Sequence, residues 1–357
     1  MERKVDPGAW RRVLVRMPNW VGDVVMATPA LRAIREASPQ ASITVALKEY
    51  VAPLLGGSPY VDAVVALGDG EERGVRGAWR LSRRLKSGRF DAAVLLTNSL
   101  TSAIPVCMAR IPVRLGYAGD GRGFLLTHSV APDLVGRQRR PMPMPEYYQR
   151  MLDRVGIPGA GPEYVCPPNE SERAEMRALL DSLGRDRARP LVGLNPGARF
   201  GSSKLWPPER FGELAATLSL RGLQPLLLCG PGEEELAQAV RSAAGNDLLD
   251  TSTNPVGLAP LRALLEMVDL LVTTDSGPRH LAVVANKPVV VLMGPTWPQW
   301  TDWNLERTAV LRHDVPCGPC HKKVCPVDHA CMDLITVEEV VSAVDGLLAA
   351  SSTDPRS

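Results

Sequence analysis

Short apolar segments alternate with amphipathic ones along most of the chain, and this alternation predicts the fold class. Several segments are rich in β-branched residues and apolar at consecutive positions, which is typical of strands buried on both faces of a parallel sheet. They are residues 13–15, 43–47, 61–67, 92–96, 191–194, 225–229, 270–273 and 289–293. Segments with helical periodicity lie between them, at residues 30–36, 78–85, 208–220, 233–243, 258–267 and 277–285. The pattern predicts an α/β fold with doubly wound parallel sheets.

The alternation breaks in the middle of the chain. Residues 135–148 are rich in Arg and Pro, a helix is predicted to end at Val155, and residues 156–169 are rich in Pro and Gly. A helix over residues 170–183 then precedes the next strand. Because domain boundaries fall in such linkers, we predict one domain at residues 1–170 and another at 171–335. A last helix is predicted at 336–350, where Thr336 and Glu339 form a capping box.

Composition narrows the class of protein without identifying it. The chain has 357 residues, 45% apolar and 22% charged, which fits a globular protein of two domains. A net charge of +2 does not favour a nucleic-acid partner. No segment approaches the length of a membrane-spanning helix, and residues 1–12 lack the apolar run of a signal peptide, so we expect a cytoplasmic protein. Residues 83–89 form a basic cluster, for which a solvated helix end is the ordinary interpretation.

Ligands of open α/β sheets bind in the loops that follow the carboxyl ends of the strands. The first such loop, residues 18–28, contains Gly22, which permits a tight turn, and Asp23, which falls near a predicted helix start. Asp is a favoured N-cap residue and interacts well with the helix dipole. It is also suited to act as a general base. The residues alone leave both interpretations open.

The second loop, residues 194–211, combines small residues with a lysine. Gly197, Gly201, Ser202 and Ser203 precede Lys204, and a helix opens after Pro207. Small residues let backbone N–H groups approach an anion, and a lysine supplies a positive charge. The spacing is not that of a Walker motif, and an ordinary loop with an exposed lysine remains the alternative.

The third loop carries Asp275, Ser276 and Gly277 into a helix that bears His280 in its first turn. Free N–H groups at that helix start can hold phosphate. Caps and a structural histidine are the alternatives. Residues 292–296 end the next strand and are expected beside this loop.

Two further features carry candidate chemistry. The turn at residues 229–235 contains Glu233 and Glu234, which could accept ribose hydroxyls or serve as acids at a helix N-terminus. Four cysteines crowd into fifteen residues and could close a tetrahedral zinc site, although the spacing is not that of a standard finger. They are Cys317, Cys320, Cys325 and Cys331. Buried free thiols or a redox-labile pair are the alternatives.

Taken together and in order, these loops resemble those of the heptosyltransferase family of lipopolysaccharide core assembly, and most closely its heptosyltransferase II group. The matching stretches are "PNWVGDVVMATPALRAIR", "NPGARFGSSKLWPPERF", "TDSGPRHLAVVANKPVVVLMGPT" and the cysteine-rich "CGPCHKKVCPVDHAC". The resemblance covers nearly the whole chain. It implies a GT-B fold, in which two Rossmann-like domains face each other across a cleft and the C-terminal helix packs back.

The resemblance also implies a reaction and its residues. An inverting enzyme would transfer heptose from ADP-L-glycero-β-D-manno-heptose to the inner core on lipid A, with the acceptor on the N-terminal domain and the donor on the C-terminal domain. Asp23 would be the general base and Lys204 would offset charge on the leaving ADP. Asp275 would contact the heptose, and Ser276, Gly277 and His280 its hydroxyls or the diphosphate. Further expected substrate contacts are Gly22, Ala198, Gly201, Ser202, Glu233 or Glu234 for the ribose, and Val256 for the adenine.

No cofactor is expected for the chemistry, since a lysine and helix N-termini can replace a metal's electrostatic role, and any zinc would be structural. The expected location is the cytoplasm, with peripheral contact at the inner membrane. Arg279 departs from the small or apolar residue usual in the family. Two alternatives remain: a related enzyme that uses another nucleotide sugar for a different surface glycan, and a non-catalytic protein that binds nucleotide sugars.

Overall fold

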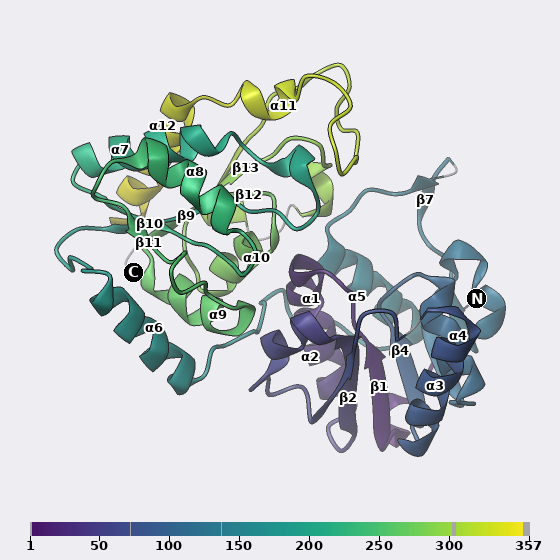
Figure 1. The fold of residues 1–357 in the computed structure, drawn as a ribbon. Helices are drawn as coiled ribbons and strands as arrows, with labels where there is room; N and C mark the ends of the chain where they lie inside the picture. Colours follow the sequence, from purple (N-terminus) through teal and green to yellow (C-terminus); the bar gives the residue numbers. More distant parts are fainter. Residues whose placement is uncertain (1, 72, 137, 302–304, 353–357) are drawn as a thin grey trace. The chain divides into compact units, whose positions relative to one another are not determined.

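The computed structural model describes residues 2–71, 73–136, 138–301 and 305–352, and it divides the chain into two compact units (Figure 1). Unit 1 comprises Met1–Cys166 and Gln299–Thr301, and unit 2 comprises Pro167–Pro298 and Asp302–Ser357. Within the described ranges, no helix is both long enough and apolar enough to cross a bilayer.

Unit 1 is built on a parallel sheet that has six strands in the described residues. The strand order is β3-β2-β1-β4-β5-β6, the order of a doubly wound nucleotide-binding fold. The strands are β1 (Arg12–Arg16), β2 (Ser42–Lys48), β3 (Ala63–Leu67), β4 (Ala92–Leu95), β5 (Val113–Tyr117) and β6 (His128–Val130). The helices are α1 (Val21–Met26), α2 (Thr28–Ala37), α3 (Gly74–Ser87), α4 (Leu100–Met108) and α5 (Met144–Val155). A short antiparallel pair, β7 (Leu134–Val135) and β8 (Gln138–Arg139), precedes α5.

Unit 2 repeats this topology. Its six described strands follow the order β11-β10-β9-β12-β13-β14, again all parallel. They are β9 (Leu191–Asn195), β10 (Gln224–Leu227), β11 (Leu249–Asp250), β12 (Leu270–Thr274), β13 (Val289–Leu292) and β14 (Thr308–Leu311). The helices are α6 (Glu170–Ser182), α7 (Pro208–Leu220), α8 (Glu234–Ala244), α9 (Leu258–Met267), α10 (Gly277–Val284), α11 (Ala330–Asp333) and α12 (Val337–Ser352).

Alternate residues of a strand point to opposite faces of its sheet, and both faces of each sheet are covered. In unit 1, Leu14 and Leu95 pack with Leu81 and Leu85 of α3 and Val106 of α4. The opposite face is covered by α1, α2 and α5, which contact one another. In unit 2, the alternation along β9, β12 and β13 places one set of apolar side chains against α7, α8 and α12. The doubly wound α/β prediction is confirmed.

The C-terminal helix packs back, as predicted, onto its own unit. α12 contacts α7 and the strands β12, β13 and β14. Its first turn has the predicted capping box: the Thr336 N–H donates to the Glu339 carboxylate at 2.8 Å, and the Glu339 N–H donates to Thr336 Oγ1 at 3.2 Å.

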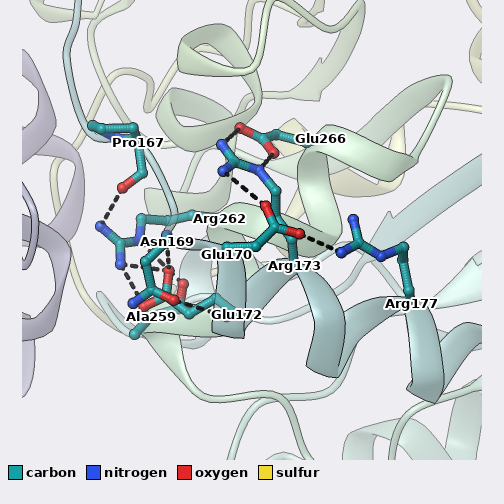
Figure 2. Close-up of polar contacts among 9 residues, drawn as sticks. All are labelled: Pro167, Asn169, Glu170, Glu172, Arg173, Arg177, Ala259, Arg262 and Glu266. Atoms are coloured by element: carbon teal, nitrogen blue, oxygen red, sulfur yellow. Dashed lines mark hydrogen bonds and ion pairs between the residues drawn. The ribbon is translucent and has the colours of Figure 1, made fainter.

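The chain passes from unit 1 to unit 2 between Cys166 and Pro167. The Pro167 carbonyl accepts a hydrogen bond from Arg262 of α9 at 3.0 Å, and the same guanidinium pairs with Glu172 of α6 at 2.6 and 2.7 Å (Figure 2). Asn169 caps α6 by accepting from the Glu172 N–H. A second pair, Arg173 with Glu266, joins the same two helices (Figure 2). Polar contacts therefore fix the first residues of unit 2 onto its α6–α9 layer.

Candidate functional site

In unit 2 the strand order reverses between β9 and β12, and this is where an open α/β sheet binds its ligands. The loop after β9 contains the turn η5 (Ser202–Lys204), and the loop after β12 contains Asp275 at the entrance to α10. Two of the predicted loops are therefore neighbours at one edge of the sheet.

Lys204 and Asp275 form a nearly buried ion pair at this edge. The Lys204 ammonium donates to Asp275 Oδ2 and to the Asp275 carbonyl, each at 2.7 Å. The two side chains are only 12% and 6% exposed. Thr296, at the end of the turn after β13, donates to the same Oδ2 at 2.6 Å. The prediction that residues 292–296 lie beside the third loop is confirmed by this contact.

Arg279 adds a second cation to the cluster. Its guanidinium lies 3.3 Å from Asp275 Oδ1, and its side chain is 2% exposed. Burial by itself would raise the pKa of Asp275, but the charges of Lys204 and Arg279 outweigh burial and hold that pKa below its ordinary range. Burial, helped by the charge of Arg279, lowers the pKa of His280 to about 3, so His280 is neutral at pH 7. Lys204, Arg279 and Asp275 together carry one net positive charge.

The N-terminus of α10 opens beside this cluster. Ser276 is the N-cap residue, but among the described residues its hydroxyl lies against Asn195 Nδ2 at 3.2 Å and Thr273 Oγ1 at 3.3 Å and does not cap the helix. The Ser276 side chain therefore leaves uncovered the N–H groups at the start of α10, to which Pro278 contributes none. Such N–H groups, next to a net positive charge, suit an anionic ligand such as a diphosphate.

The cysteine-rich segment holds the lysine loop in place. The Ser203 N–H donates to the Lys323 carbonyl at 3.1 Å, and Ser203 Oγ donates to the Lys322 carbonyl at 2.5 Å. His329 Nε2 donates to the Ser203 carbonyl at 2.9 Å, since a carbonyl can only accept. A Cβ on Gly201 would lie 2.2 Å from the Lys323 carbonyl oxygen, so only glycine fits there.

Glu233 and Glu234, predicted as equal candidates, are placed differently. Glu233 Oε2 accepts from the Gly230 N–H at 2.9 Å, and a Cβ on Gly197 would lie 2.0 Å from Glu233 Oε1. The Glu233 carboxylate therefore lies against the turn after β9. Glu234 accepts from the Gly232 N–H of its own turn at 3.1 Å and is exposed. Geometry favours Glu233 for a ligand contact at this edge of the sheet.

The remaining predicted donor contacts lie around the same edge. Val256 is buried, and its N–H donates to the Cys229 carbonyl after β10 at 3.0 Å. Ala198 is half-buried and Ser202 is exposed, both in the loop after β9. Whether they touch substrate stays a prediction.

Asp23 lies in unit 1, at the carboxyl end of β1, where the unit 1 sheet has its own reversal of strand order. The interpretation of Asp23 as an N-cap is wrong: α1 begins at Val21, Trp20 is the N-cap residue, and Asp23 belongs to the first helical turn after Gly22. Asp23 is half-buried beside Tyr148 of α5. Burial raises the pKa of Tyr148 strongly, and the negative charge of Asp23 adds to that rise.

The four clustered cysteines line one cavity of about 250 Å³ with His329 and Ser203. Cys331 is buried and Cys317 is exposed, and none of the chain's seven cysteines, all of which are described, forms a disulfide. Burial raises the pKa of Cys331, and the other three thiols add to the rise. Among the described residues, no three His, Cys, Asp or Glu side chains are grouped as metal ligands would be. Zinc at these thiols stays a prediction.

Comparison with known families identifies the chain. The model of glycosyltransferase family 9 (heptosyltransferase) matches residues 78–331. The chain belongs to glycosyltransferase family 9. It is 30% identical over 311 residues to lipooligosaccharide heptosyltransferase 2 of Haemophilus influenzae, a match that covers 84% of this chain and 88% of that protein.

Solved structures agree with this family. ADP-heptose lipopolysaccharide heptosyltransferase II of Escherichia coli matches with a TM-score of 0.77 and 27% identity, covering 96% of this chain and all of the other. A family 9 glycosyltransferase of Veillonella parvula matches in fold, with a TM-score of 0.80 at 22% identity over 98% and 99% of the two chains. The fold is GT-B, and this family member is a glycosyltransferase.

Sequence reasoning missed several residues of the cluster around Lys204 and Asp275. Thr296 belongs to a predicted neighbouring turn and was given no role. Asn195 lies in the predicted second loop and was given no role either, and Thr273 was assigned only to a strand. All three have side-chain hydrogen bonds to the Asp275–Ser276 turn. A polar residue at the carboxyl end of a buried strand, such as Asn195, is the signal that could have found them.

Proposed function

We propose that this protein transfers heptose from ADP-L-glycero-β-D-manno-heptose to the inner core of lipopolysaccharide, with inversion at the anomeric carbon. Membership of family 9 supports a sugar transfer. The names of the matched proteins, a lipooligosaccharide heptosyltransferase 2 and an ADP-heptose lipopolysaccharide heptosyltransferase II, support heptose as the sugar and the core as the acceptor.

The donor site of this proposal is the cluster around Lys204 and Asp275. The net positive charge of Lys204, Arg279 and Asp275, with the N–H groups at the start of α10, would bind the diphosphate and stabilise the charge that grows on ADP as it leaves. Neutral His280 would hold a sugar hydroxyl or a phosphate oxygen without adding charge. Glu233 would accept the ribose hydroxyls.

The acceptor side of the proposal rests on Asp23. An acceptor hydroxyl attacks the anomeric carbon from the face opposite ADP, and Asp23 takes the hydroxyl proton as the new C–O bond forms. The bond to ADP breaks at the same carbon, and its electron pair leaves with the diphosphate. Half-burial beside Tyr148 in a first helical turn leaves Asp23 partly accessible and close to a favourable helix dipole.

The acceptor in this proposal is a lipid-linked saccharide, so the enzyme would work from the cytoplasm against the inner face of the membrane.

The observation that carries the donor assignment is the Lys204–Asp275 pair at the β9–β12 switch point.

The experiment is a screen of ADP- and UDP-linked sugars against defined core acceptors with the purified protein. Transfer from ADP-heptose to an inner-core acceptor is the expected result. Turnover only with another nucleotide sugar, or tight binding without turnover, would replace this proposal with a different glycan enzyme or a binding protein.

A further inference from the structure

The outer face of α3 concentrates the positive charge of a chain that is nearly neutral overall. Seven basic residues and no acidic one lie between Arg73 and Phe90, against a net charge of +2 for all 357 residues. Gly77, Ala78, Leu81, Ser82 and Leu85 are buried against the core of unit 1. The basic side chains of Arg76, Arg80, Arg83 and Lys86 are exposed on the opposite side.

Large apolar side chains are exposed on α3 and on the elements packed next to it. Val75 is 84% exposed and Trp79 is 50% exposed on α3. The neighbouring α4 packs against α3 (Figure 1). The short helix η4 (Gly123–Leu125) packs against α4. α4 exposes Leu100 and Met108, and η4 exposes Phe124 to 79%. Exposed apolar groups gathered on contacting elements are unusual for a surface that faces only water.

We infer that this surface, which we term the α3–α4 face (Val75, Trp79, Leu100, Met108 and Phe124 with the basic side chains of α3), binds an anionic lipid bilayer. The inference rests on the proposed function, in which the acceptor is a lipid-linked saccharide, and it names the surface that brings the enzyme to that lipid. Arginine and lysine side chains are attracted to anionic headgroups, while exposed aromatic and aliphatic groups enter the interface.

Two details favour a bilayer over a protein partner. The Arg83 guanidinium lies over the Trp79 ring, with its Cζ 5.0 Å from the centre of the ring. This pair of side chains therefore presents an apolar ring and a cation together. Tryptophan with an adjacent cation is suited to the headgroup level, where apolar and charged surroundings meet. The charge on α3 is also of one sign, which complements a continuous anionic surface.

The test is co-flotation of the full-length protein with vesicles of phosphatidylethanolamine and about 30% phosphatidylglycerol, and with phosphatidylcholine vesicles as the zwitterionic comparison. We expect binding to the anionic vesicles that weakens as salt rises. Each basic side chain contributes about five-fold, so Arg76→Gln/Arg80→Gln/Arg83→Gln should reduce binding roughly a hundred-fold. Trp79→Ser should reduce it independently of salt.

The matched control is Arg177→Gln/Arg187→Gln/Arg221→Gln, which removes the same charge from exposed positions of unit 2. The control should bind like wild type. Equal loss in both triple variants, equal binding to both kinds of vesicle, or no binding by wild type would overturn the inference.

Activity with a soluble, delipidated core acceptor separates the two proposals. The α3 variants should keep wild-type turnover with that acceptor, since they lie outside the catalytic residues. A wild-type protein that binds vesicles and transfers no heptose would refute the proposed function and leave the α3–α4 face standing.

Discussion

The Lys204 ammonium lies 2.7 Å from Asp275 Oδ2, although 71 residues separate the two along the chain. The two residues meet because β9 and β12 are adjacent parallel strands that end at the same edge of the sheet, and each residue lies in the loop after one of them. Thr296 donates to the same oxygen as the lysine, and Arg279 lies against the other oxygen, Oδ1. The lysine is thus fixed in position before any ligand arrives, as electrostatic stabilisation of a leaving group requires.

Removal of the Lys204 side chain should lower turnover with the donor far more than it weakens binding of the acceptor. We expect Lys204→Ala to lower kcat/KM for ADP-heptose at least a hundred-fold, because the charge that offsets the leaving diphosphate is lost. Lys323→Ala is the matched control, since the hydrogen bond between Lys323 and the loop is made by its backbone carbonyl and its side chain is exposed. Steady-state kinetics with each substrate varied would decide. A loss below ten-fold, or an equal loss in the control, contradicts the role.

His280 should make the protein less stable on mild acidification. The pKa of His280 in the folded protein, about 3, lies below the ordinary value of 6.5. Between these two pH values the unfolded chain therefore binds a proton at this residue and the folded protein does not. The contribution of His280 to the free energy of unfolding is complete above pH 6.5, and it falls by about 2 kcal/mol between pH 7 and pH 5. Urea unfolding at both pH values, with His280→Asn for comparison, measures it.

The Asn variant should lose less stability over that pH interval than wild type. An NMR titration of the imidazole gives the same answer directly. A His280 resonance that titrates near pH 6.5 in the folded protein would refute the prediction.

His329 is expected to position the lysine loop through its bond to the Ser203 carbonyl. His329→Ala should lower kcat about ten-fold with little change in donor KM, because the loop loses one of its three tethers. His329→Gln keeps an N–H donor and should restore most of the rate. Equal loss in both variants would mean that the ring fills space in the cysteine-lined cavity and its hydrogen bond is unimportant.

The two Arg–Glu pairs that join α6 and α9 offer a stability test with an internal control (Figure 2). Arg262 is 2% exposed beside Glu172, so Arg262→Ala leaves a largely buried carboxylate unpaired and should cost about 3 kcal/mol of unfolding free energy. Arg173 and Glu266 are each about one-third exposed, and Arg173→Ala should cost less than about 1 kcal/mol. Similar urea midpoints for the two variants would contradict this account of the linker.

The strongly periodic elements could be predicted from sequence alone. The predicted bounds of α7 and α9 match the structure: α7 begins at a pair of prolines, and α9 follows Gly257. The helix α4 was missed because Pro105 lies inside it, and β5 because Arg114 and Gly116 interrupt its apolar pattern. β6 and β11 are too short to show a period, and β14 has only half-buried residues and begins with a threonine.

The candidate site, like the fold, has features that could be predicted from the sequence and features that could not. Loops at strand ends can be found by pattern, and the loops of Lys204 and Asp275 were. The contact of Thr296 with Asp275 depends on which strands are neighbours, and the sequence predicted only that its turn lies beside the Asp275 loop. The contact of Arg279 with Asp275 is local, since the two residues are four positions apart, and it was missed. The N-cap position at Trp20 depends on backbone angles, which the sequence around Asp23 does not encode locally.

The central claim is that this protein transfers heptose from ADP-heptose with inversion, with Asp23 as the base. The most direct measurement follows ADP release and the anomeric configuration of the product, for wild type and Asp23→Asn, with an inner-core acceptor. The account predicts an α-linked product from the β-linked donor, and turnover at least a hundred-fold slower in the folded Asn variant. A β-linked product, no product with ADP-heptose, or near-normal turnover without the carboxylate would contradict it.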